Sequence, residues 1–73
     1  MGLPKQKGKN MILVITYNEN DKEMSEHQFD DEVKAEEFAF NVLGMDSRKG
    51  TVCRTAMYEE TETAQKLIAE FEF

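Results

Sequence analysis

His27 and Cys53 carry the side chains of this sequence that most often do chemistry, since histidine transfers protons or binds metals and cysteine acts as a nucleophile. The chain has one residue of each type. His27 lies in the segment EHQFDD beside Glu26, Asp30 and Asp31, but one histidine among carboxylates matches no spacing of transition-metal ligands. We therefore predict a solvated histidine on an edge strand and a buried, inert thiol at Cys53.

Longer motifs for catalysis or cofactor binding are absent from the sequence. The four glycines, at positions 2, 8, 44 and 50, form neither of the glycine-rich patterns that bind phosphates, G-x-x-x-x-G-K-[ST] and G-x-G-x-x-G. No zinc-protease, CxxC or EF-hand spacing occurs, and no spacing suggests a serine, histidine and acid acting together. We predict no catalytic residues, no cofactor and no metal, so the chain is not expected to be an enzyme.

The charge is strongly acidic and unevenly distributed. Residues 1–10 contain three of the nine Lys and Arg residues and none of the fifteen acids, so residues 11–73 have a net charge of 6 − 15 = −9. Such a surface repels phosphate-rich ligands and attracts basic protein surfaces. Nucleic acid is therefore not the expected partner. The alternative is weak nucleic-acid binding by the basic residues, which are Lys5, Lys7, Lys9, Arg48, Lys49 and Arg54.

An amphipathic helix over residues 30–45 is the element that would position any binding surface. Its apolar residues recur at helical spacing and form one face, which consists of Ala35, Phe38, Ala39, Val42, Leu43 and Met45. Asp30 or Asp31 could cap the first turn, and Gly44 could supply a left-handed cap at the end.

Val33 and Phe40 do not belong to that apolar face. They are seven residues apart, so they lie on one line of the helix, and Glu36 and Glu37 flank this line. One interpretation is that a second helix covers Phe40, or that it is an isolated exposed apolar residue. The other is an apolar spot with an acidic rim that binds a partner protein. The candidate partner-binding residues are Val33, Glu36, Glu37 and Phe40.

The remaining elements predict a small α+β domain. The apolar segment 11–17, MILVITY, is typical of a central strand, and 22–29 is typical of a charged edge strand after a turn at 18–21. Residues 51–58 favour a third strand. The order β-β-α-β-α then predicts a three-stranded antiparallel sheet, order 2-1-3, packed by one or two helices. Residues 1–10 are expected to be a flexible basic arm, and residues 11–73 a single domain.

The C-terminal segment has two interpretations. Ala64, Leu67, Ile68 and Phe71 have the i, i+3, i+4, i+7 spacing of a helix, which is the preferred prediction. The alternation in the last residues, FEF, would instead favour a terminal strand.

The expected function follows from size, acidity and the missing motifs, which are typical of phage and mobile-element accessory proteins. We expect a non-enzymatic protein-binding module that inhibits or modulates a larger protein, itself possibly a nucleic-acid-binding one. A homodimer is a further expectation, because a core of this size gains from association. The lone cysteine and the lack of a long apolar segment lead us to expect a cytoplasmic protein without a membrane span.

Overall fold

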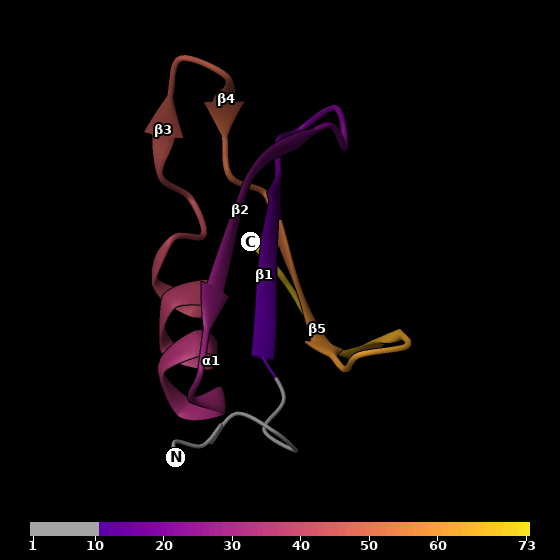
Figure 1. The fold of residues 1–73 in the computed structure, drawn as a ribbon. Helices are drawn as coiled ribbons and strands as arrows, with labels where there is room; N and C mark the ends of the chain where they lie inside the picture. Colours follow the sequence, from indigo (N-terminus) through magenta and orange to yellow (C-terminus); the bar gives the residue numbers. More distant parts are fainter. Residues whose placement is uncertain (1–10) are drawn as a thin grey trace.

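The protein is an α+β fold with a four-stranded antiparallel sheet and one helix among the described residues (Figure 1). The computed structural model describes residues 11–73, and the predicted basic arm over 1–10 lies outside them. The elements are β1 Met11–Tyr17, β2 Glu23–Phe29, α1 Glu32–Asn41, β3 Asp46–Ser47, β4 Gly50–Thr51, β5 Arg54–Glu60 and β6 Gln65–Glu72. The α+β class is thus confirmed. The predicted three-stranded order 2-1-3 is corrected to the four-stranded order β2-β1-β5-β6.

The hairpin of β1 and β2 is set by its turn. The Asn18 side-chain oxygen accepts hydrogen bonds from the backbone N–H groups of Asn20 (2.8 Å) and Lys22 (3.0 Å). Asp21 takes a left-handed conformation with φ of 63°, which Asp tolerates better than most side chains. The reversal places Ile12 opposite Phe29 and Val14 opposite His27. β1 is apolar along its length because it lies between β2 and β5.

The helix α1 is shorter than the predicted span 30–45. Asp31 caps it by accepting a hydrogen bond from the Val33 N–H at 2.9 Å, and the helix ends at Asn41. Gly44 has a φ of +84°, and its N–H donates to the Val52 carbonyl at 2.7 Å, so the chain has already left the helix. Met45 is consequently 57% exposed rather than part of the buried face.

The core lies between α1 and one face of the sheet. Ala35 and Ala39 are fully buried against Ile12, Val14 and Met57. Alanine allows the helix backbone to approach the sheet closely, and the partly buried residues at the margin are Phe29, Phe38, Ile68, Ala69 and Phe71. The Thr55 hydroxyl, buried in the same layer, donates to the Ala39 carbonyl at 3.1 Å and ties β5 to the helix backbone.

The predicted C-terminal helix is wrong, because residues 65–72 form the edge strand β6. A register shift between Met57 and Tyr58 leaves Ile68 as an extra residue in β6, so Ile68 and the adjacent Ala69 both pack against the core. A bulge of this kind disrupts the alternation by which strands are recognised. The consequence is that no second helix covers Phe40 within residues 11–73.

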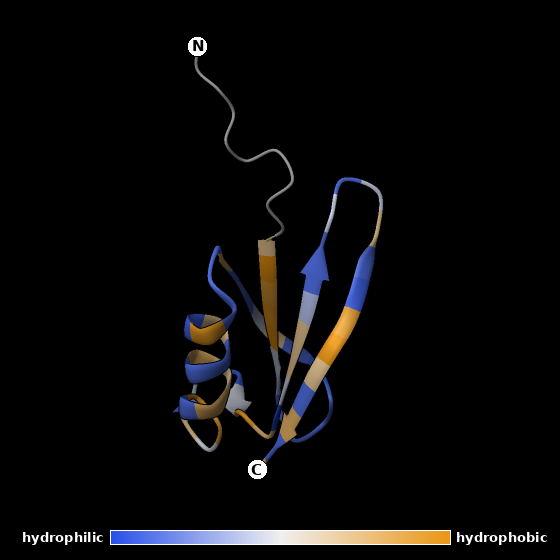
Figure 2. Cartoon of the chain, turned by 90° about the horizontal axis from the view of Figure 1, so that it is seen from below, coloured by the Kyte–Doolittle hydropathy of each residue, from blue (hydrophilic) through white to orange (hydrophobic). Residues whose placement is uncertain are grey.

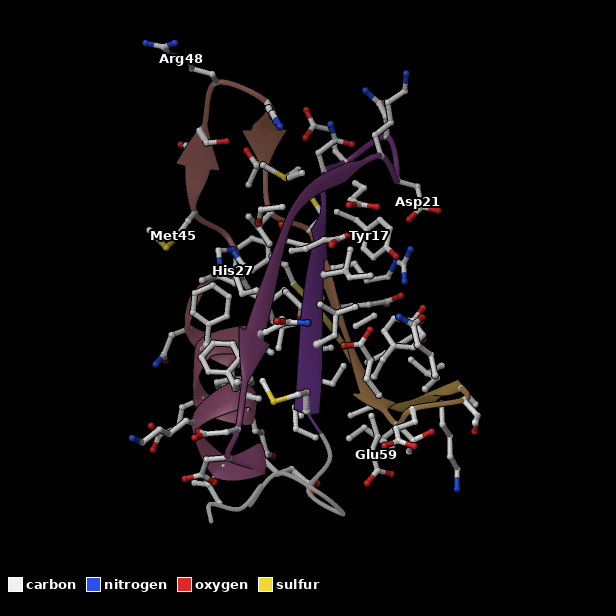
Figure 3. All side chains as sticks on the ribbon, viewed as in Figure 1. Tyr17, Asp21, His27, Met45, Arg48 and Glu59 are labelled. Carbon is white, nitrogen blue, oxygen red and sulfur yellow. The ribbon has the colours of Figure 1, made fainter. Side chains whose placement is uncertain are left out.

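The sheet face opposite α1 carries no covering element in the described part of the chain (Figure 2). Arg54 holds this face together at one end. Its guanidinium bonds Asp21 at 2.7 Å and Glu70 at 3.0 Å, and lies 3.9 Å from the centre of the Tyr17 ring. These contacts connect the β1–β2 turn, β5 and β6, and Figure 3 shows Tyr17 and Asp21 side by side at this end of the sheet.

Replacing Arg54 by alanine is expected to lower the free energy of unfolding by about 1–3 kcal/mol, because one guanidinium makes charged hydrogen bonds and stacks on an aromatic ring. Arg54→Lys should recover only part of this, since an ammonium cannot form the forked contacts. Urea denaturation measures both. Arg48→Ala is the control, since Arg48 is exposed at the tip of the β3–β4 hairpin (Figure 3). Equal losses for Arg48→Ala and Arg54→Ala would contradict the assignment.

Candidate functional site: a groove between the helix and the edge strand

The four candidate residues on α1 lie together along one hollow of the surface. Val33, Glu36, Glu37 and Phe40 line a groove of about 330 Å³, and Phe71 of β6 completes it. The helix supplies one wall and the edge strand the other. The two carboxylates stand on the helix wall, so the groove has an apolar interior and an acidic rim. We refer to these five residues as the α1–β6 groove.

The aromatic side chains of the α1–β6 groove are in contact but remain accessible. Phe40 and Phe71 meet edge to face, with ring centroids 6.0 Å apart and planes at 78°, an arrangement that aromatic pairs favour. Phe40 is nevertheless 63% exposed, as is Val33. The interpretation that Phe40 is covered by a second helix is therefore wrong. Its exposure is shared with a neighbouring apolar residue, so it is not isolated.

The α1–β6 groove is positioned by rigid parts of the fold. Ala35 and Ala39 on the opposite side of α1 have no exposed surface, and the bond from Thr55 to the Ala39 carbonyl fixes the last turn against the sheet. Phe71 is held by its pairing with Thr55 across β5 and β6. Both walls are thus attached to β5, which makes the groove a preformed feature.

A second hollow of about 290 Å³ lies between β2, the end of α1 and the β3–β4 hairpin. It contains His27, whose Nε2 is 3.0 Å from the Ser25 hydroxyl, and that hydroxyl is 2.7 Å from the Thr16 hydroxyl. The His27 ring packs against Phe38 with centroids 4.5 Å apart. His27 is therefore half-buried rather than solvated. A nucleophile–base pair needs a third group to orient the base, and here the neighbour across the ring is a phenyl group.

Cys53 is half-buried, not fully buried as predicted. Its backbone N–H donates to the Tyr17 carbonyl at 2.9 Å, and its carbonyl accepts from the Phe73 N–H at 3.0 Å. These bonds place it at the junction of three strands, where its backbone rather than its thiol has the defined role.

Two of the basic residues of the nucleic-acid alternative are engaged within the protein. Arg54 is paired with Asp21 and Glu70, and the Lys49 ammonium donates to the Met24 carbonyl at 3.1 Å. Arg48 points away from both at the hairpin tip (Figure 3). Lys5, Lys7 and Lys9 lie outside the described residues. The structure therefore does not gather these six residues on one described surface.

Acidic side chains crowd the open face of the sheet near the start of β2. A hydrogen bond shared with Glu23, together with the charges of Glu23 and Glu60, raises the pKa of Glu26 above its ordinary value of 4.5. Glu60 accepts hydrogen bonds from Gln28 (3.1 Å) and Gln65 (2.9 Å). The folded state thus concentrates like charges here, which favours the protonated form of Glu26.

Replacing Glu26 by glutamine should raise the melting temperature at pH 7, because it removes that repulsion. A carboxylate whose folded-state pKa is raised loses stability as the pH rises through that pKa, so the gain should shrink below pH about 4, where wild-type Glu26 is itself protonated. Thermal unfolding at the two pH values measures this. Glu62→Gln, in an exposed turn, should change little. A larger gain at acidic pH than at neutral pH is the opposite result.

No protein-family model, curated protein or solved structure matches this chain. Within residues 11–73, no group of three histidine, cysteine or acidic side chains is arranged to hold a metal ion. The described helix is too short and too polar to cross a membrane. Phe71 is the groove residue that the sequence prediction missed, since it was assigned to a helix. The alternation in FEF was the signal that could have placed it in a strand.

Proposed function

We propose that this protein is a small, acidic, non-enzymatic binding module that inhibits or modulates a larger protein, and that the α1–β6 groove is its contact surface. The observation that carries the proposal is the exposure of Phe40 and Val33, 63% each, beside Phe71 in one groove. An accessible aromatic residue at the centre of an apolar groove is what a protein interface uses as an anchor.

The charges around the α1–β6 groove support a partner with a basic surface. Glu36 and Glu37 line it directly, and residues 11–73 have a net charge of 6 − 15 = −9. Charge complementarity of this kind accelerates association and selects partners, and it is screened by salt. The partner we expect therefore has Lys or Arg around an apolar side chain that can enter the groove.

The rigidity of the groove also supports binding rather than catalysis. A preformed site loses little conformational entropy when a partner docks. An active site would need a nucleophile, a base and a group orienting the base near one another, whereas the groove offers two carboxylates and three apolar side chains.

A pair of charge reversals tests the proposal. Glu37→Lys changes the groove rim, and Glu62→Lys makes the same charge change in an exposed turn. The protein, immobilised at low salt, is exposed to lysate of the organism that encodes it, and the retained protein is then titrated against each variant. We expect Glu37→Lys to weaken binding by about tenfold, the effect of losing a close interfacial charge contact, and Glu62→Lys to leave it nearly unchanged.

The salt dependence of the same titration separates two forms of the proposal. If an apolar anchor dominates, the affinity for the retained protein should fall only moderately between low and high salt. A steep fall would indicate that rows of carboxylates act as a nucleic-acid mimic. Equal effects of Glu37→Lys and Glu62→Lys would show that the groove is not the contact surface.

A further inference from the structure

We propose that the partner adds an extended segment to the outer edge of β6, with apolar side chains toward the α1–β6 groove and lysine or arginine side chains toward Glu70 and Glu72. This inference rests on the proposed function and specifies how that surface binds. It is carried by the free sheet edge, by the direction of the backbone groups along it and by the charges on its two faces.

The two edges of the sheet differ. At β2, the Lys49 ammonium donates to the Met24 carbonyl at 3.1 Å, and a register shift lies between Thr16 and Tyr17. A lysine on the edge and a bulge both discourage strand addition. At β6, no described element lies beyond the strand, which forms the outer margin of the sheet next to the groove (Figure 2).

The backbone of β6 offers a donor and an acceptor pattern to an added strand. The Phe73 N–H bonds the Cys53 carbonyl at 3.0 Å, and in an antiparallel pair residues alternate between bonding the neighbour and facing away. Phe71, opposite Thr55, therefore also bonds β5. The N–H and C=O groups of Glu70 and Glu72 consequently point outward.

The side chains of β6 present different chemistry on the two faces of the sheet. Phe71 and Ala69 pack on the side of α1, whereas Glu70 reaches Arg54 on the opposite side. Residues directly opposite on neighbouring strands have side chains in contact. A segment that alternates apolar and basic residues would extend the groove on one face and pair with carboxylates on the other.

The acidic edge disfavours a second copy of this chain as the occupant. Two β6 strands side by side would bring Glu70 and Glu72 of both copies onto one face, and like charges across strands are destabilising. A basic segment gains from the same charges, which is why we assign the edge to a partner of opposite charge.

The test uses a synthetic octapeptide that alternates lysine and valine, and a peptide of equal composition with the four lysines grouped. Each is titrated into the full chain by calorimetry. Glu70→Pro removes an outward N–H without removing a bond to β5, which an edge strand tolerates. Glu70→Gln is the matched control, because it removes the same charge and keeps the N–H. Circular dichroism and the melting temperature verify that both variants are folded.

We expect the alternating peptide to bind more tightly than the grouped one, and Glu70→Pro to weaken it about tenfold relative to Glu70→Gln, as for one lost backbone hydrogen bond. Equal affinity of the two variants, or of the two peptides, would overturn strand addition. So would a dimer of the protein alone that Glu70→Pro dissociates.

Failure of this inference is distinguishable from failure of the proposed function. If Phe40→Ser abolishes binding of the lysate protein while Glu70→Pro does not, the groove stands and strand addition is wrong. If Glu70→Pro abolishes binding of the octapeptide but the lysate protein is retained equally by wild type and Phe40→Ser, the groove is not the partner's site.

Discussion

Replacing Phe40 by serine is expected to weaken binding of the partner by at least about 30-fold, the effect of losing a central aromatic anchor worth about 2 kcal/mol or more. The same change should lower the free energy of unfolding by no more than about 1 kcal/mol, because Phe40 is 63% exposed and contacts the core margin only through Phe71. Titration of the retained partner and urea denaturation measure the two effects on one protein.

Phe73→Ser is the matched control for this prediction. Phe73 is 81% exposed and packs beside Gly44 rather than in the groove. The two variants make the same chemical change, so a general effect of removing a surface phenyl group would be equal in both. Equal affinities of Phe40→Ser and Phe73→Ser for the partner would contradict the assignment of the groove.

Replacing Met57 by alanine should produce the largest loss of stability, about 2–5 kcal/mol, because truncating a buried methionine removes transfer free energy and leaves a cavity. Met57 is 2% exposed and packs under α1 with Val14 and Ala39. A chain of this size has a net stability of only about 5–10 kcal/mol, so much of it would be lost. Urea denaturation at neutral pH measures the change.

Leu67→Ala is the control for Met57→Ala. Leu67 also lies in the sheet but is 47% exposed, so its truncation should cost about 1 kcal/mol or less. A similar cost for both variants would mean that the layer between α1 and the sheet is not the core. Since α1 carries the groove, the same result would remove the rigid support of the proposed site.

The helix and the first hairpin were predictable from sequence because local patterns decide them. The β-branched segment of β1 and the Asn and Asp residues of its turn favour the hairpin, and the aspartates before α1 favour a helix start. The end of α1 was not predictable in this way. Val42, Leu43 and Met45 continue the helical spacing, but Gly44 adopts φ +84° and bonds β-structure through Val52.

The C-terminal strand was missed because two periodicities compete in it. Ala64, Leu67, Ile68 and Phe71 have helical spacing, yet the segment is the last strand of the sheet. The extra residue at Ile68 breaks the alternation and conceals the strand. Tertiary pairing with β5 decides the outcome, and that pairing is not visible in a local sequence pattern.

The grouping of the candidate residues depends partly on sequence and partly on topology. Val33, Glu36, Glu37 and Phe40 share one helix surface by spacing alone, as any residues three, four and seven apart do. What the helix faces could not be deduced while residues 61–73 were assigned to a second helix. Placing Phe71 on an edge strand turns a covered surface into an open groove.

The contact surface can be located most directly by nuclear magnetic resonance on isotope-labelled protein titrated with the unlabelled partner that it retains. The account predicts that the largest changes in chemical shift and exchange protection fall on Val33, Glu36, Glu37, Phe40 and Phe71. Changes confined to the open sheet face around Tyr17 and Tyr58, or to the hairpin tip at Arg48, would contradict it.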